Sequence, residues 1–317
     1  MQLTMKKMGA AAIAAALALC VAPAMAMLTP GTAHAAGKAS ITKLYHEGDL
    51  DIDIITTKVT KKEQADGSHW ASLTNYTGKA VKPKVEVRVY DKDYEGKRTE
   101  KYWDDEKKKI VKETYTTKYR PLKVVNVTGK SSKEAKKLIK KKKADVTIEY
   151  KNNKNIGRAQ VVIKGVNKYK GTVYQTFSIN VPQVKTVKVK AAKKALNVSW
   201  KKVKGATHYQ VAVRDKAAGE TVKTVLVDAK KKSVKIKGLK AKRAYEVTVQ
   251  ACANGVKSSY KTTESVKYDQ KWETVTDEWG DMDEKLVSYK TLNFTGSYES
   301  IGTYWGDESP VKVKKTK

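Results

Sequence analysis

Alternation of apolar and polar residues is the main pattern along this chain. In the stretch VTIEYKNNKNIGRAQVVIKG, Val146, Ile148 and Tyr150 alternate with polar neighbours, and the alternation resumes at Ala159. Period two is the spacing of a strand with one buried face, and the intervening Asn and Gly residues tolerate the positive φ that a chain reversal needs. The stretch therefore predicts a β-hairpin, with its lysines and asparagines at the turn and rim.

The same spacing predicts further strands on both sides of this hairpin. Asp49, Asp51 and Asp53 alternate with Leu50 and other apolar residues. A calcium loop would need a Gly directly after the third aspartate, where this chain has Ile, so the pattern favours a half-buried strand. Other predicted strands carry inward residues Val85, Val87 and Val89; Val173, Phe177, Ile179 and Val181; Leu196, Val198 and Trp200; and Tyr209, Val211 and Val213.

One stretch has the pattern of a helix. In SSKEAKKLIKKKK, Ser131 precedes Glu134 by three residues, which predicts a capping box, and Ala135, Leu138 and Ile139 form one apolar stripe. We expect a short amphipathic helix over 131–143 and no other helix after the N-terminal segment.

The N-terminal segment has the features of a secretory signal peptide. Lys6 and Lys7 precede an apolar run from 10 to 26, and small-x-small triplets end at residues 26 and 35. The run is shorter than the roughly twenty residues that span a membrane, so we expect residues 1–35 to be cleaved, at Ala35 rather than the earlier site. We then expect a secreted chain, and because no LPxTG-like motif occurs we expect no covalent surface anchor.

Two regions resemble known families. YTGKAVKPKVEV, with Tyr76 and Pro83, and the stretch 146–179, with Gly157 and Phe177, are similar to an immunoglobulin-like repeat of Gram-positive secreted and surface proteins. The resemblance implies a β-sandwich over residues 38–182. This chain departs from the pattern in a long insert at about 94–143.

Residues 183–267 resemble the fibronectin type III module. In GLKAKRAYEVTVQ, Leu239 stands six residues before Tyr245, the spacing of the tyrosine corner in that family. The two resemblances together imply an all-β fold of two tandem sandwiches, Ig-like and fibronectin type III-like, with one short helix in the insert. Neither family carries catalytic residues or a cofactor.

The tail, residues 268–317, differs from the rest in charge and aromatic content. Residues 269–309 hold ten acids and three lysines, a net −7, together with Trp272, Trp279 and Trp305. We expect a β-rich tail whose strands either lie back on the basic sandwich or form an independent aromatic patch. The three tryptophans are the candidate ligand-binding residues: with Trp103 they either stack on sugar rings or fill a core.

Catalytic and metal-binding chemistry is not indicated. The histidines after residue 37 are His46, His69 and His208, far apart in sequence, and no HxxxH, CxxC or GxSxG motif occurs. The carboxylate clusters at 104–106 and 281–284 match acidic turn tips better than a catalytic pair. We therefore predict no catalytic residue, no metal and no cofactor.

The one cysteine beyond the signal segment, Cys252, has outward parity because Val249 and Ala251 take the inward positions. An outward thiol could pair between chains, whereas a slightly buried cysteine would be inert. The sequence leaves both interpretations open.

The chain is strongly basic. Lysine and arginine number 65 against 33 acids, a formal charge of +32, and lysines outnumber arginines 59 to 6. Lysine is a hydrated point charge that attracts any polyanion, whereas specific nucleic-acid readout favours arginine. The expected partners are cell-wall polyanions, glycans or host surface proteins, and the expected function is that of a non-enzymatic adhesion, binding or structural protein. The alternative is a carbohydrate-binding accessory protein.

Overall fold

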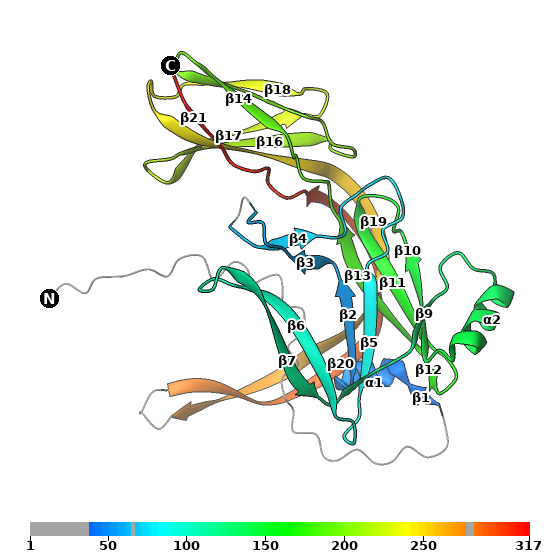
Figure 1. The fold of residues 1–317 in the computed structure, drawn as a ribbon. Helices are drawn as coiled ribbons and strands as arrows, with labels where there is room; N and C mark the ends of the chain where they lie inside the picture. Colours follow the sequence, from blue (N-terminus) through cyan, green and yellow to red (C-terminus); the bar gives the residue numbers. More distant parts are fainter. Residues whose placement is uncertain (1–37, 65–66, 277–281) are drawn as a thin grey trace. The chain divides into compact units, whose positions relative to one another are not determined.

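The structure, a computed structural model, describes residues 38–64, 67–276 and 282–317. Within these residues it consists almost entirely of strands, with two short helices (Figure 1). The predicted all-β sandwich fold is therefore confirmed. The predicted signal peptide lies outside the described residues.

The first body, residues 38–180, holds two main sheets. Their hydrogen-bonded orders are β2-β5-β8 and β13-β11-β10-β9, and three two-stranded sheets accompany them. The elements are β1 (Ala39–Ser40), α1 (Ile41–Glu47), β2 (Leu50–Ile55), β3 (Thr57–Val59), β4 (Trp70–Ser72), β5 (Lys84–Tyr90), β6 (Gly96–Asp104), β7 (Lys109–Thr117), β8 (Tyr119–Pro121), β9 (Val124–Asn126), α2 (Ser132–Lys142), β10 (Val146–Lys151), β11 (Gly157–Gly165), β12 (Tyr169–Lys170) and β13 (Thr172–Ile179).

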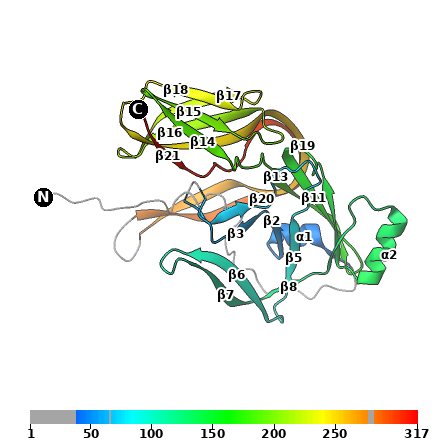
Figure 2. The same cartoon turned by 45° about the horizontal axis from the view of Figure 1, so that its top comes forward.

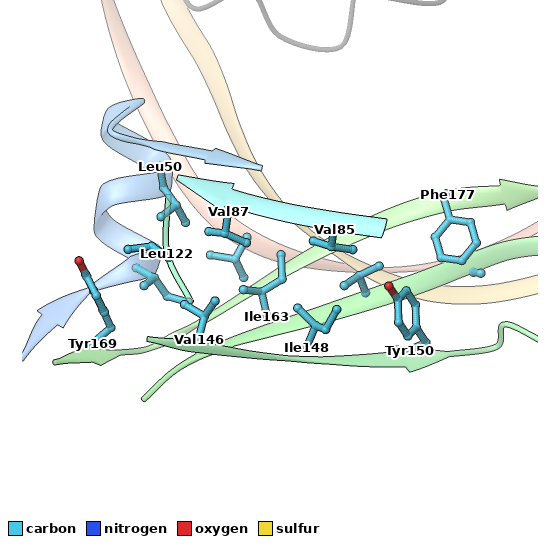
Figure 3. Packing of buried hydrophobic residues seen from close by; sticks show 14 of the residues in the cluster. Leu50, Val85, Val87, Leu122, Val146, Ile148, Tyr150, Ile163, Tyr169 and Phe177 are labelled. Carbon is cyan, nitrogen blue, oxygen red and sulfur yellow. The ribbon is translucent and has the colours of Figure 1, made fainter. Parts of the chain in front are cut away.

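The core of the first body lies between its two main sheets. Val85 and Val87 of β5 face Ile148 and Ile163 of the opposing sheet (Figure 3). All are less than 10% exposed. Burial raises the pKa of Tyr150 to about 12, so its hydroxyl stays protonated as it donates to the Pro83 carbonyl. Period-two alternation thus identified the inward face correctly.

The strand register confirms the hairpin predicted for VTIEYKNNKNIGRAQVVIKG. β10 and β11 pair antiparallel with Tyr150 opposite Val161, and Asn152 adopts φ 55° in the turn between them. β11 pairs in turn with β13, with Ala159 opposite Phe177. The asparagines and lysines therefore belong to a turn, as predicted.

The predicted helix α2 is present, and the structure contains a second helix, α1, that the sequence pattern did not predict. Ser131 accepts from the Glu134 backbone while the Glu134 side chain accepts from Ser131, so the capping box is present. The expectation of a single helix was wrong, because α1 forms between an N-cap at Ser40 and a left-handed C-cap at Gly48 with φ 82°. Ile41 of α1 is fully buried, and such packing stabilises a helix too short to persist alone.

The second body, residues 181–253 and 304–317, is also a sandwich. Its sheets have the orders β14-β15-β18 and β17-β16-β19, and β21 pairs with β19 on the edge away from β16. The elements are β14 (Val187–Ala192), β15 (Ala195–Trp200), β16 (His208–Asp215), β17 (Glu220–Asp228), β18 (Ser233–Lys237), β19 (Ala244–Thr276), β20 (Met282–Trp305) and β21 (Lys312–Lys315).

The tyrosine corner predicted from the spacing of Leu239 and Tyr245 is present. The Lys240 backbone N–H donates to the Tyr245 hydroxyl at 3.0 Å, and both Leu239 and Tyr245 are buried. The predicted inward residues of β15 and β16 are also buried. The corner ties the loop before β19 to the end of the sandwich.

The tail departs from an ordinary sandwich end. β19 runs unbroken from Ala244 to Thr276, past residue 267 where the sequence predicted a boundary, and β20 returns beside it (Figure 1). Asn254 and Gly255, a pair that favours tight hairpin turns, here lie in a register shift between Ala253 and Val256. We call residues 254–276 and 282–303 the long hairpin. Within the tail, Tyr304, Trp305 and β21 pair with β19 inside the sandwich, whereas residues 282–302 pair with residues 256–276 of the long hairpin.

The last strand closes the second body. β21 pairs antiparallel with the start of β19, with Tyr245 opposite Lys314. Just before it, Ser309 is fully buried, and its backbone and hydroxyl exchange hydrogen bonds with Val249 at 3.0 and 2.9 Å. The edge of β19 is therefore satisfied by residues about sixty positions further along the chain.

The prediction that the Cys252 side chain faces outward was wrong. Its side chain is 0% exposed, like that of Ala251, so this part of β19 is covered on both faces. Alternation along a strand distinguishes buried from solvent-exposed side chains only where one face of the sheet is exposed to solvent. Burial raises the pKa of the Cys252 thiol, and pairing between folded chains is excluded.

An ion cluster fixes the β6–β7 hairpin to the sheet β2-β5-β8. The Arg88 guanidinium, about nine-tenths buried, contacts Asp51 and Asp53 at 2.8 and 2.6 Å and also pairs with Glu86. Arg98 of β6 contacts Asp53 at 2.8 Å. The alternating aspartates are thus the polar face of a strand, as predicted, and they hold two arginines that the sequence pattern did not connect to them.

We predict that Ser309→Ala lowers the free energy of unfolding by about 1–3 kcal/mol, because the buried Val249 N–H loses its acceptor. Urea denaturation followed by circular dichroism measures the change. The control is Ser233→Ala on an exposed position of β18. Equal stability of the two variants would contradict a closing role for this segment.

We predict that Arg88→Met destabilises the chain by about 3 kcal/mol at pH 7, because three carboxylates lose their shared buried cation. Lys84→Met removes an exposed partner of the same Glu86 and should cost under about 1 kcal/mol. Equal losses in both variants at pH 7 would refute the assigned role.

Candidate functional site

Of the three predicted tryptophans, the structure describes the backbone positions of Trp272 and Trp305, which lie far apart. In the β19–β20 register Trp305 lies opposite Cys252, whereas Trp272 lies opposite Leu286. At about 3.3 Å per residue, their positions are separated by roughly 60 Å along the ladder. Trp305 is 38% exposed, and Trp279 lies outside the described residues. Glycan binding by any one of them stays a prediction, but Trp272 and Trp305 do not share one stacking platform.

Trp103, the further candidate from the insert, is engaged within the chain. Its ring stacks on His69 with centroids 3.6 Å apart and planes 13° from parallel. One face of this indole is therefore covered by the imidazole, which leaves less of the ring for a sugar.

The acidic cluster of the insert is a turn tip, as predicted. Asp104 ends β6, and its carboxylate accepts hydrogen bonds from the backbone of Glu106 and from the backbone and ammonium of Lys107. The hydrogen bond from Lys107 is the main reason that the pKa of Asp104 is lowered. The second cluster begins at residue 281, outside the described residues.

A cavity of 440 Å³ lies beside the Arg88 cluster, lined among others by Tyr94, Lys97 and Arg98. The guanidinium donors of Arg88 and Arg98 already point at Asp51, Asp53 and Glu86. Such satisfied donors hold a hairpin in place and leave little for a ligand. Within the described part of the chain, no group of three or more His, Cys, Asp or Glu side chains is placed to hold a metal ion.

Helix α2 carries the most concentrated run of positive charge in the described residues. It lies at the margin of the first body in both views (Figures 1 and 2), and none of its residues is fully buried. Its one acid, Glu134, is used in the N-terminal cap. Among the ion pairs of the described residues, none involves the lysines of this helix, all of them exposed: Lys133, Lys136, Lys137, Lys140, Lys141, Lys142 and, at the C-cap, Lys143.

The local sequence explains why these lysines are displayed. The capping box fixes where the helix begins, and Lys143 in the left-handed region ends it. Ala135, Leu138 and Ile139 are partly buried and keep the helix against the body, so the remaining positions face water. Lysines three and four residues apart lie on neighbouring turns, with about 5–6 Å between their Cβ atoms. The sequence pattern singled out Lys140 to Lys143; the structure adds three lysines of the earlier turns.

Arginine and lysine have separate roles in this chain. Arginine forms planar, paired hydrogen bonds with carboxylates, whereas lysine is a hydrated point charge. The lysines of α2 can therefore attract a polyanion without recognising its detailed shape. Five of the six arginines are in ion pairs: Arg88, Arg98, Arg120, Arg214 and Arg243.

None of the helices in the described residues is long and apolar enough to cross a membrane.

Comparison with known proteins identifies one part of the chain. The model of the fibronectin type III domain matches residues 181–267. A crystal structure of the FN1–FN3 domains of chicken CNTN1 is similar at 23% identity and a TM-score of 0.21, covering 31% of this chain and 36% of that one. A segment of two fibronectin type III domains from chicken tenascin is similar at 11% identity and a TM-score of 0.30, covering 80% and 98%.

No curated protein matches the chain. This chain spans about a third of the CNTN1 structure. The family match agrees with the tyrosine corner and with the inward residues of the second body. Residues 181–267 match the fibronectin type III family, and the chain that contains them has an all-β sandwich fold.

Proposed function

We propose that this chain is an exported, non-enzymatic modular protein that binds or spaces components at a Gram-positive cell surface or wall. Fibronectin type III domains are binding and structural modules, and sandwiches of this kind occur widely on cell surfaces. The resemblance of the first body to an immunoglobulin-like bacterial repeat supports the same assignment.

The observation that carries the proposal furthest is the lysine array of α2. Seven exposed lysines stand on one short segment, and a helix holds them at regular spacing. A polymer of repeating anionic groups, such as a wall phosphate polymer, presents charges at intervals that such an array can follow. Contacts of this kind release counterions, so the affinity falls steeply as salt rises.

The net charge of the chain adds to this attraction. A formal +32 produces a positive potential that raises the local concentration of any polyanion. Proteins of a host surface and neutral glycans are weaker candidates, because no described feature complements them as the lysines complement phosphate.

We predict that Lys133→Gln, Lys136→Gln, Lys137→Gln and Lys140→Gln, combined in one variant, weaken binding to purified walls that retain their phosphate polymers. The slope of log affinity against log salt should fall by about one for each lysine that contacts the polymer. Co-sedimentation of the chain with walls across a salt titration measures both effects.

The matched control changes four exposed lysines of the second body, Lys188, Lys190, Lys235 and Lys237, to Gln. Both variants lose the same net charge, so a larger loss for the α2 variant locates the site. Walls stripped of phosphate polymers should bind neither variant. Equal losses for the two variants would reject α2 as the site, and salt-independent binding would reject the electrostatic mechanism.

A further inference from the structure

Asn254 is the one asparagine of the sequence that precedes a glycine. The backbone nitrogen of the following residue can attack the side-chain carbonyl carbon of an asparagine, which closes a succinimide ring and releases ammonia. A Cβ on the following residue crowds this approach, and glycine has none. The pair Asn254–Gly255 is therefore the place in this chain where deamidation meets the least steric resistance.

The structure leaves this pair open to solvent and outside the regular strand pairing. Both residues are exposed. The register of β19 with β20 passes from Ala253 to Val256 without a cross-strand partner for the two residues between them. Gly255 adopts φ 67°, and a Cβ at this position would have nothing within 4 Å. Strand pairing and crowding therefore do not prevent the Gly255 nitrogen from approaching the Asn254 side chain.

His208 lies beside the nitrogen that leaves in this reaction. Nδ2 of Asn254 is 3.3 Å from Nδ1 of His208. The register of β16 with β19 brings the two together, because His208 lies opposite Cys252, two residues before the asparagine. An amide nitrogen leaves as ammonia only after it takes up a proton, and imidazole both gives and takes protons near neutral pH. The imidazole is thus in contact with a reacting atom.

Thr207 holds the backbone of the same asparagine. The Asn254 backbone N–H donates to the Thr207 hydroxyl at 2.9 Å, and this hydroxyl donates to the Cys252 carbonyl at 3.3 Å. The hydroxyl also lies 3.1 Å from Nδ1 of His208. The start of β16 therefore positions the imidazole and the asparagine relative to each other, which an unfolded chain does not do.

We propose that Asn254 is a self-modifying site, at which His208 supplies the proton that lets the side-chain amide leave as ammonia. The Gly255 nitrogen forms a bond to Cγ of Asn254 and gives up its proton to water. The Cγ–Nδ2 bond breaks, and Nδ2 leaves with a proton from His208, which solvent then restores. Water opens the succinimide to aspartate or to isoaspartate.

The reaction changes the point at which β19 leaves the second body. Either product replaces a neutral amide by a carboxylate, and isoaspartate also adds a methylene group to the backbone. Both changes fall at the base of the long hairpin, and neither product returns to asparagine. The site needs only the chain and water, so it does not depend on the binding function proposed for α2.

The test is peptide mapping by mass spectrometry of the purified chain during incubation at neutral pH. Residue 254 should convert to aspartate and isoaspartate, and the variant Asn254→Asp provides the standard for the first product. Asn155 and Asn293 are internal controls, because both are exposed and are followed by bulkier residues, the first in a turn and the second in a strand. Conversion of either control as fast as Asn254 would overturn the proposal.

The variant His208→Gln separates the histidine from the intrinsic reactivity of the dipeptide. When folded, as checked by circular dichroism, it should deamidate at residue 254 at least about tenfold more slowly than the wild type. When unfolded in urea, the two chains should react equally fast.

The matched control is His69→Gln, which removes a half-buried histidine of the first body and should react like the wild type. Equal rates for the folded wild type and the folded His208→Gln variant would overturn the proposal. An equal slowing by His69→Gln would also overturn it, since the loss would then not be specific to the imidazole beside Asn254.

Discussion

The pairing of β19 is the constraint on which the rest of the second body depends. A strand inside a sheet needs partners for its backbone groups on both edges, because buried N–H and C=O groups without partners are costly. β16 satisfies one edge of β19 from Tyr245 to Cys252, and β20, Ser309 and β21 satisfy the other in turn. The chain must therefore leave the body, reverse and come back before the sandwich is complete.

This constraint explains why the fold could be predicted better than its connections. Alternating residues such as Val85, Val87 and Val161 identify strands because each residue responds only to its immediate surroundings. The capping box of α2 and the tyrosine corner are local in the same sense. β21 could not be predicted, because four residues rich in lysine say little about a partner strand some seventy positions earlier.

The errors in the sequence interpretation share a physical cause. The alternation of its neighbours predicted an outward, solvent-facing side chain for Cys252. Both faces of this part of β19 are covered, so alternation does not distinguish buried from exposed positions there. α1 was missed because seven residues have little helical preference of their own and depend on the burial of Ile41. For the candidate site, composition indicated a lysine-rich surface, but the distance between Trp272 and Trp305 follows only from the strand register.

The position of β21 has a consequence for how the protein forms as it is synthesised. Tyr245 pairs with Lys314, so a chain that emerges N-terminus first cannot complete this sheet until residue 314 has emerged. Strand pairings so distant in sequence also form slowly, because the entropy cost of closing a long loop precedes the favourable contacts. The second body is therefore completed only after β21 has been synthesised, and until then one edge of β19 stays without its partner strand.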